Sequence, residues 1–175
     1  IVQWDDNLNS NEILAWRYVD RKNPAKSDEL GNWTQLVVRE SQEAILFKDG
    51  KALDLFGAGR HTLSTNNIPL LGRLMNLATG GESAFKAGVW FVNRASVLDV
   101  KWGTQNPILL RDPEYQIPIY VRAFGQFGIR VSDSRQFVVK LAGNKTQVTC
   151  GEVAEYFKGL ILSRMGDMIA TYIAR

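Results

Sequence analysis

Short apolar runs separated by polar and turn-forming residues recur along the first half of the chain, a pattern consistent with buried strands. Short runs of this kind predict strands at residues 13–19, 34–39, 44–48 and 51–55, and two further strands at 87–93 and 97–102. Asp49-Gly50 separates two of these runs and predicts a tight hairpin, because both residues tolerate positive φ. We therefore expect the first half of the chain to be rich in β structure.

The clearest period-two pattern covers residues 117–131. Its apolar members are Ile117, Ile119, Val121, Ala123, Phe127, Ile129 and Val131, and they alternate with Gln116, Tyr120, Arg122, Gln126 and Arg130. Such a segment predicts one strand with a buried face and a wet face. Gly125 and Gly128 inside it predict a bend or a bulge.

Three segments have helical spacing. Apolar residues recur at near-helical intervals over 67–77, Asp133 can cap a helix over 134–142, and Thr149 with Glu152 forms a capping box for a final helix. The apolar stripe of that final helix falls within about 40° of one line at about 100° per residue. Its members are Ala154, Phe157, Ile161, Met165, Met168 and Tyr172. The chain is thus predicted to be an α+β protein that ends in a long amphipathic helix.

Composition supports an ordinary globular chain and excludes several classes. The 175 residues are 45% hydrophobic and 22% charged, which argues against disorder, collagen and disulfide scaffolds. No apolar run approaches the ~20 residues that a transmembrane helix needs. The net charge of +3 is spread along the chain without a basic block, so we expect a solvated surface, at most a weak attraction to anionic membrane, and no nucleic-acid partner.

Residues that could carry catalysis are few. His61 is the single histidine, Cys150 is the single cysteine, and carboxylate pairs such as Asp5 and Asp6 lie in polar loops. The position of Cys150 at a helix start could lower the pKa of its thiol. Gly57-Ala58-Gly59 has the start of a dinucleotide loop but lacks the third glycine. We therefore predict no catalytic residue, no cofactor, no metal and no small-molecule substrate.

Two features could instead make contacts. The apolar segment at 67–77 either folds onto the sheet or forms an exposed loop that touches membrane or a neighbouring subunit; for the second case the predicted contact residues are Ile68, Leu70, Leu71 and Leu74. Trp4, beside Ile1 and Val2, is predicted to sit at a lipid interface. We expect the other tryptophans to pack in the core or on a sheet face.

The two ends of the chain indicate a longer protein. The chain begins at Ile1 rather than at a methionine, and its last residues, through Arg175, still follow a helical pattern without a cap. We therefore expect further residues on both sides, where an anchor and a coiled coil would lie.

Several motifs together resemble those of one family. The stretch FGAGRHTL at 56–63 resembles the G-x-G-x-H-x-L turn of the SPFH, or band-seven, family, which includes stomatin, prohibitin and flotillin; Gly57, Gly59 and His61 occupy its fixed positions. The stretches FVN at 91–93 and DVKWGT at 99–104 resemble one bacterial branch, often labelled "virion core protein"-like. The stretches RAFG at 122–125, RVSD at 130–133 and IVQW at 1–4 are similar to that branch as well.

This resemblance implies a scaffold rather than a catalyst. It implies a curved, mostly antiparallel sheet with flanking helices, in one domain with two sub-regions. Residues up to about 95 would be membrane-proximal, and residues from about 96 would lead into an oligomerising helix, carried here by Phe157, Ile161, Met165, Met168 and Tyr172. The implied partners are further copies of the chain and membrane lipid or membrane proteins, at the cytoplasmic face of the bacterial membrane.

Two other functions stay open at this point. One is a soluble protein-interaction module without lipid contact, because these residues contain no anchor. The other is a small enzyme or a nucleotide binder that uses the turn at Gly57.

Overall fold

The computed structural model describes residues 1–9, 11–64, 67–74, 85–142 and 145–173. These residues form two compact units. Unit 1 comprises residues 1–95 and 130–150, and unit 2 comprises residues 96–129 and 151–175. Residues 130–150 thus return to the first unit, whereas the sequence placed them in the second sub-region.

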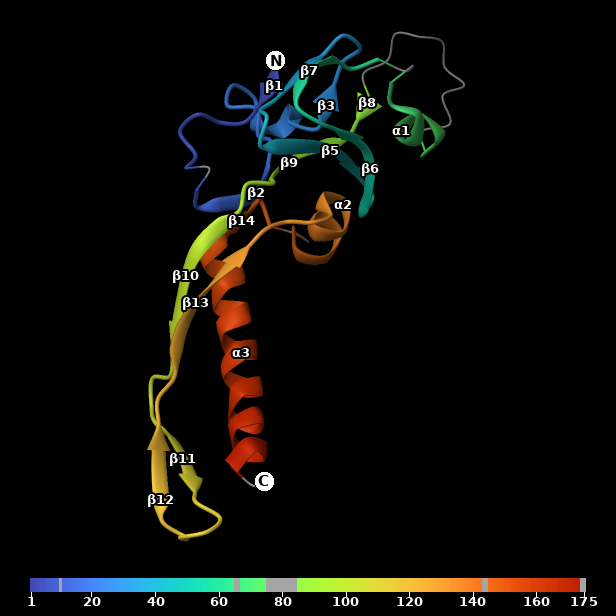
Figure 1. The fold of residues 1–175 in the computed structure, drawn as a ribbon. Coiled ribbons are helices and arrows are strands. Elements are labelled where there is room, and N and C mark those ends of the chain that lie inside the picture. The colour runs from blue at the N-terminus through green and yellow to red at the C-terminus, as the bar shows by residue number, and fades with distance from the viewer. Residues whose placement is uncertain (10, 65–66, 75–84, 143–144, 174–175) are drawn as a thin grey trace. The chain divides into compact units, whose positions relative to one another are not determined.

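Unit 1 is built on a five-stranded antiparallel sheet in the order β14-β2-β9-β5-β6 (Figure 1). Its strands are β2 (Ile13–Arg17), β5 (Gln42–Lys48), β6 (Lys51–Phe56), β9 (Gly88–Asn93) and β14 (Gln147–Thr149). Between β5 and β6, Asp49 and Gly50 have φ of 50° and 75°, so the hairpin predicted at this dipeptide is confirmed.

Smaller sheets complete the β structure of unit 1. β1 (Val2–Gln3) pairs in parallel with β4 (Gln35–Val38), which pairs antiparallel with β7 (Gly59–Thr62). β3 (Glu29–Leu30) pairs with β8 (Phe85–Lys86), and a short 3₁₀-helix, η1, covers Pro24–Lys26. The prediction of an α+β fold with mostly antiparallel sheets is therefore confirmed.

The main core of unit 1 lies against one face of the five-stranded sheet. Trp4, Trp16 and Phe91 form its aromatic centre: the Trp4 and Trp16 ring centroids are 5.9 Å apart, and the Trp16 and Phe91 rings stack at 6.0 Å. Strand β9 is buried along its whole length, on both faces. A central strand covered on both sides reads as a continuous apolar run, which is why residues 89–92 show no alternation.

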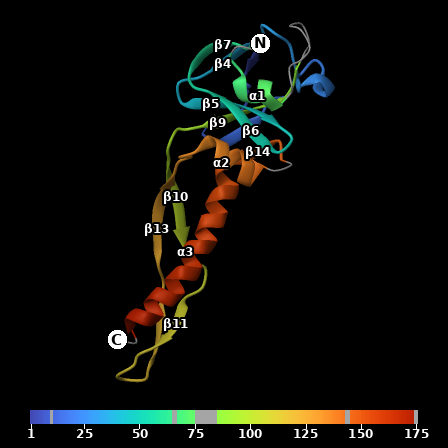
Figure 2. The same ribbon diagram turned by 90° about the vertical axis from the view of Figure 1, so that its right-hand side faces the viewer.

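Two short helices of unit 1 pack against β6 (Figure 2): α1 (Pro69–Leu74) and α2 (Ser134–Phe137). The Asp133 side chain accepts a hydrogen bond from the Gln136 amide at 2.9 Å, so the predicted cap is present. α2 continues as a π-helix, η2 (Val138–Ala142), instead of the single helix expected over 134–142. Of the helix expected over 67–77, α1 covers six residues, and residues 75–77 lie outside the described part of the chain.

Unit 2 consists of a long β ribbon and one helix. β10 (Val97–Gly103) pairs with β13 (Phe124–Ile129), and β11 (Ile108–Arg111) pairs with β12 (Pro118–Val121). The single strand expected over 117–131 is therefore wrong: it is divided between β12 and β13, and the sequence pattern missed β11. α3 (Cys150–Ile173) runs beside the ribbon in both views (Figures 1 and 2), and Phe127 contacts Phe157 with ring centroids 6.5 Å apart.

Gly125 has no side chain, and this leaves space for the Trp102 ring on the ribbon. It pairs with Trp102 across the strands, and a Cβ atom at Gly125 would lie 3.0 Å from the Trp102 indole. At Gly103, on the same ribbon, the nearest atom would be 3.5 Å away, an ordinary van der Waals contact. Close packing of an aromatic ring thus accounts for Gly125, whereas the register shift between Val97 and Val100 lies opposite Gly128, where the sequence predicted a bend or a bulge.

We expect Gly125→Ala to lower the free energy of unfolding of unit 2 by about 1–3 kcal/mol, because the added methyl group must displace the Trp102 ring. Gly103→Ala is the matched control and should cost less. Urea unfolding followed by tryptophan fluorescence measures both variants. Equal costs at the two positions would contradict the packing argument.

Candidate functional site

The turn with family spacing closes the connection between β6 and β7. His61 Nε2 lies 2.8 Å from the Gly57 carbonyl oxygen, and its ring packs 5.2 Å from that of Phe56. Gly59 has φ of 125°, a backbone conformation that side chains with a Cβ rarely adopt. A strand follows Gly59, not the helix that a dinucleotide loop requires. Gly57, Gly59 and His61 therefore belong to a strand-to-strand turn that the His61–Gly57 contact stabilises.

The predicted contact segment divides into buried and exposed residues. Ile68 and Leu71 lie in the core of unit 1, and Leu70 is 38% exposed. Leu74 closes α1, but its side chain lies outside the described part of the structure. Contact with lipid or with a subunit stays a prediction, and in this conformation only Leu70 among the described side chains is accessible for it.

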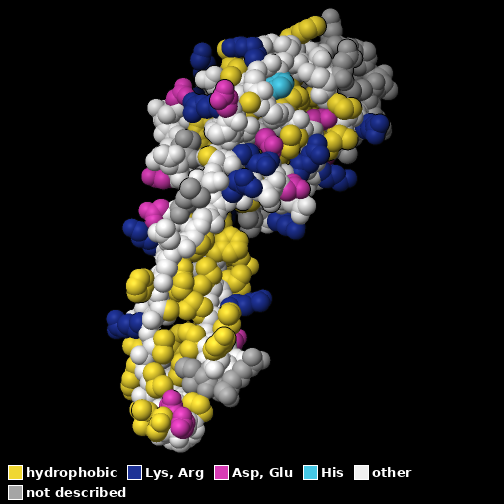
Figure 3. All heavy atoms as spheres, in the orientation of Figure 1, with side chains coloured by type: hydrophobic (Ala, Val, Ile, Leu, Met, Phe, Trp, Pro, Cys, Tyr) yellow, Lys and Arg dark blue, Asp and Glu magenta, His cyan; other side chains and the backbone are white. Residues whose placement is uncertain are grey.

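Leu70 lines a shallow hollow of ≈ 640 Å³ on the surface of unit 1. Leu53 and Val139 contribute apolar side chains to it, and Lys51 and Arg73 add positive charge. Lys and Arg side chains also gather over β6 and α2 on the face seen in Figure 3. An apolar floor beside cations is the arrangement with which interfacial proteins meet anionic lipid.

Asp54 holds α1 in place beneath this hollow. The carboxylate lies on β6, is buried, and accepts hydrogen bonds from the backbone amides of Leu70 at 3.0 Å and of Leu71 at 2.8 Å. It thereby satisfies amides that the first turn of a helix leaves without an intrahelical partner. Asp54, a side chain from a neighbouring strand, thus caps the N-terminus of α1.

A second polar contact secures α2. The Glu43 carboxylate of β5 accepts hydrogen bonds from Ser134 Oγ at 2.5 Å and from Arg94 Nη1 at 2.8 Å, and Arg135 Nε donates to the Leu53 carbonyl at 3.0 Å. Ser134 is buried. These bonds fix α2 and η2, and with them Val139, at the edge of the hollow.

The exposure of two tryptophans, Trp4 and Trp33, is the reverse of what the sequence predicted. Trp4 is buried in the aromatic centre of unit 1, so in this conformation it presents no surface to lipid. Trp33 is 75% exposed, with φ of 73°, in the turn between Gly31 and Thr34. An exposed indole in a left-handed backbone is unusual and adds a second candidate for interfacial contact. The sequence signal was its position two residues after Gly31, between the polar residues Asn32 and Thr34.

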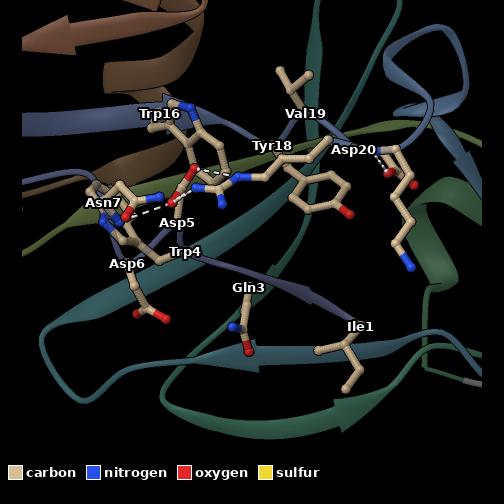
Figure 4. A pocket seen from close by; sticks show the side chains of 12 residues that line it. Ile1, Gln3, Trp4, Asp5, Asp6, Asn7, Trp16, Tyr18, Val19 and Asp20 are labelled. Atoms are coloured by element: carbon tan, nitrogen blue, oxygen red, sulfur yellow. Dashed lines mark hydrogen bonds and ion pairs between the residues drawn. The ribbon is translucent and has the colours of Figure 1, made fainter.

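A pocket of ≈ 690 Å³ lies near the N-terminus of unit 1, lined by Ile1, Asp5, Tyr18, Asp20, Arg21 and others (Figure 4). Arg21 donates two hydrogen bonds to Asp5 and holds the pKa of that carboxyl below its usual range. Burial raises the pKa of Tyr18. Asp20 accepts hydrogen bonds from the backbone amides of Lys22 and Asn23, and Asp6 forms an ion pair with Arg39. Among the described residues, no group of three or more His, Cys, Asp or Glu is placed to hold a metal ion.

Cys150 does not have the character of a reactive thiol. It is buried, Sγ lies 3.4 Å from the Asn11 carbonyl oxygen, and burial raises its pKa. The helix start was expected to be able to lower this pKa, but desolvation by burial has the largest effect and raises it.

The stripe predicted on α3 is only partly buried. Phe157, Ile161 and Met165 are partly covered, whereas Met168 and Tyr172 are largely exposed. Apolar residues also lie off the stripe, at Tyr156, Leu160, Leu162 and Ile169, so α3 is apolar on more than one side. None of the helices in the described part of the chain has the length and apolarity that a membrane span requires.

Comparison with known proteins identifies the family. The SPFH domain-Band 7 family matches residues 15–174, and the chain belongs to this family. It is also similar to an uncharacterized protein, YdjI, of Bacillus subtilis (strain 168), with 25% identity over 176 residues. That alignment covers 100% of this chain and 50% of the relative, so the chain spans about half the length of the relative it matches. No solved structure shows significant similarity.

We expect Asp54→Ala to lower the free energy of unfolding of unit 1 by about 1–2 kcal/mol and to speed hydrogen exchange at the Leu70 and Leu71 amides. Asp54→Asn keeps one acceptor oxygen and should fall between the wild type and the alanine variant. Exchange measured by mass spectrometry tests this. Unchanged protection of these two amides would contradict the role given to Asp54.

We expect native Cys150 to react with iodoacetamide at pH 8 at least about tenfold more slowly than in urea, because burial lowers both its access and its thiolate fraction. Intact-mass spectrometry over time gives both rates. A native rate equal to the unfolded rate would show that the thiol is accessible.

Proposed function

We propose that this chain is part of a membrane-associated scaffold that self-assembles and recruits partner proteins to the cytoplasmic face of the bacterial membrane. Membership of the SPFH family supports a membrane-associated scaffold in general. The motifs at 91–93 and 99–104 support placing the chain in the bacterial "virion core protein"-like branch. Because the chain spans about half of the relative it matches, the role of the whole protein is part of this proposal.

The observation that carries the membrane part is the hollow around Leu70. It combines apolar side chains from β6, α1 and η2 with the cations of Lys51 and Arg73. Leu70 and Val139 would enter the acyl boundary, and the cations would meet lipid phosphates. Trp33 would add an interfacial aromatic ring.

A non-enzymatic role fits the described residues. His61 bonds to backbone, Cys150 is buried, and the turn at Gly57 lacks the following helix of a nucleotide loop. The function would then reside in surfaces that bind lipid and protein rather than in a reaction centre.

Contact through this hollow would be weak in a single copy. Inserted side chains contribute about 0.8 kcal/mol for each buried CH₂ group, so one leucine and one valine hold a monomer only briefly. Many copies in one assembly would multiply that contact.

We expect Leu70→Glu to lower flotation of the full-length protein with anionic vesicles, because a carboxylate would replace an apolar group between cations and lipid. Leu55→Glu is a closely matched control, since Leu55 is 37% exposed on β6 and does not line the hollow. Trp33→Ala tests the second candidate in the same assay. Circular dichroism checks the fold of each variant.

Equal flotation of the Leu70→Glu and wild-type proteins would remove the hollow as the contact site. If the wild-type full-length protein fails to float, the soluble-module alternative replaces autonomous lipid binding.

A further inference from the structure

Strand β1 forms an outer edge of the small sheet β1-β4-β7 in unit 1. Val2 and Gln3 pair in parallel with β4, and among the described residues no strand pairs with the other edge of β1. An unpaired strand edge presents backbone N–H and C=O groups that can accept a further strand. An extended peptide can therefore continue this sheet beyond β1.

The pocket of ≈ 690 Å³ near the N-terminus opens beside this edge. Ile1 and Gln3 line it from one side, and Tyr18, Val19 and Asp20, which follow β2, line it from the opposite side (Figure 4). None of the lining residues belongs to β4, so the pocket lies away from the edge of β1 that is already paired. We call this space the β1 pocket. Its volume falls within the range of about 300–1,000 Å³ that is typical of binding pockets.

The wall opposite β1 is held in place by the rest of unit 1. The Tyr18 amide donates a hydrogen bond to the Val89 carbonyl at 2.8 Å, and the Asp20 amide donates to Ser27 Oγ at 2.9 Å. The Tyr18 ring also packs on Trp16 of the aromatic centre, with ring centroids 6.1 Å apart. The wall is therefore formed before any ligand arrives, which lowers the cost of ordering it on binding.

The β1 pocket favours a neutral occupant with an apolar side chain. Tyr18 and Val19 supply the apolar part of its wall. Its charged lining residues show no positive excess: they are Asp5, Asp6, Asp20, Arg21 and Lys22. Because Asp5 is already bonded to Arg21, the pocket offers little to a lipid phosphate. Backbone groups along one side and an apolar wall along the other fit an extended polypeptide segment.

We propose that the free edge of β1 binds an extended segment of a partner protein, which adds a strand to the sheet β1-β4-β7. The backbone of the segment would form hydrogen bonds with β1, and one of its apolar side chains would lie against Tyr18 and Val19. In strand addition, main-chain bonds supply affinity and side-chain pockets supply selectivity. This inference rests on the recruitment part of the proposed function and names the surface that would carry it.

A random peptide library displayed on phage tests the contact with the full-length protein. The phage are first depleted on the Val19→Lys protein, whose lysine would fill the pocket, and then selected on the wild-type protein. Synthetic copies of the selected peptides should bind the Val19→Lys protein about tenfold or more weakly than the wild type, as expected for loss of a central contact. Val139→Lys is the matched control, because Val139 lies on η2 and does not line the β1 pocket. Circular dichroism checks the fold of both variants.

The peptide backbone supplies a second test, which needs no variant of the protein. N-methylation of single peptide amides should lower the affinity about fivefold or more at alternate positions and have little effect at the positions between them, because only every second amide faces β1. Hydrogen exchange followed by mass spectrometry should show slower exchange in residues 1–4 when the peptide is bound. If no peptide survives the selection, or if methylation has equal effects at all positions, strand addition at β1 is overturned.

Cross-linking in bacterial cells separates this inference from the proposed function. A photoreactive amino acid replaces Gln3 in the full-length protein, and we expect an adduct with another protein that co-expression of a selected peptide reduces. If formaldehyde links the wild-type protein to other proteins but Gln3 yields no such adduct, recruitment stands and the β1 edge is overturned. An adduct at Gln3 that contains only a second copy of the chain would also overturn the inference. Absence of any other protein from both experiments would contradict recruitment itself.

Discussion

Burial of β9 on both faces is the constraint on which unit 1 depends. On one face, Phe91 stacks on Trp16 and meets Trp4 from the N-terminal segment, and on the other, Trp90 and Val92 are equally shielded from solvent. A strand buried in this way needs cover from both sides. The first residues of the chain and its central strand are therefore parts of one core, so a substitution at Trp4 acts on the whole unit.

In unit 2, several large apolar side chains are exposed, whereas the core of unit 1 buries its large apolar side chains. Its ribbon has two strands at every level, and one helix can cover only one of its faces. Phe124 and Tyr120 are therefore exposed although their side chains are as apolar as those buried in unit 1. Unit 2 therefore lacks, among the described residues, the second layer from which a sandwich gains free energy by burial of apolar area.

Local features of this fold, such as turns and caps, can be predicted from the sequence better than strand pairing or the burial of a side chain. The hairpin at Asp49-Gly50 and the cap at Asp133 were predictable because the chemistry of one or two residues determines them. Strand β11 was not predictable in this way. Its short apolar run does not alternate with polar residues, and it forms a strand because it pairs with β12. The same limit applies to the site: periodicity groups Ile68, Leu70 and Leu71, but only the packing of α1 on β6 makes Leu70 accessible. The different exposure of Trp4 and Trp33 likewise comes from tertiary packing, which their flanking residues do not determine.

In the proposed function, lipid contact and self-assembly would depend on each other energetically. A hollow with a few apolar side chains and cations binds a membrane weakly, and its affinity rises when many copies bind together. A contact between copies that uses residues other than those of the hollow would leave the lipid-binding side chains themselves unaltered. Assembly would then increase membrane affinity without a change in the lipid site, and loss of the contact between copies would weaken membrane binding although Leu70 and its neighbours are unaltered.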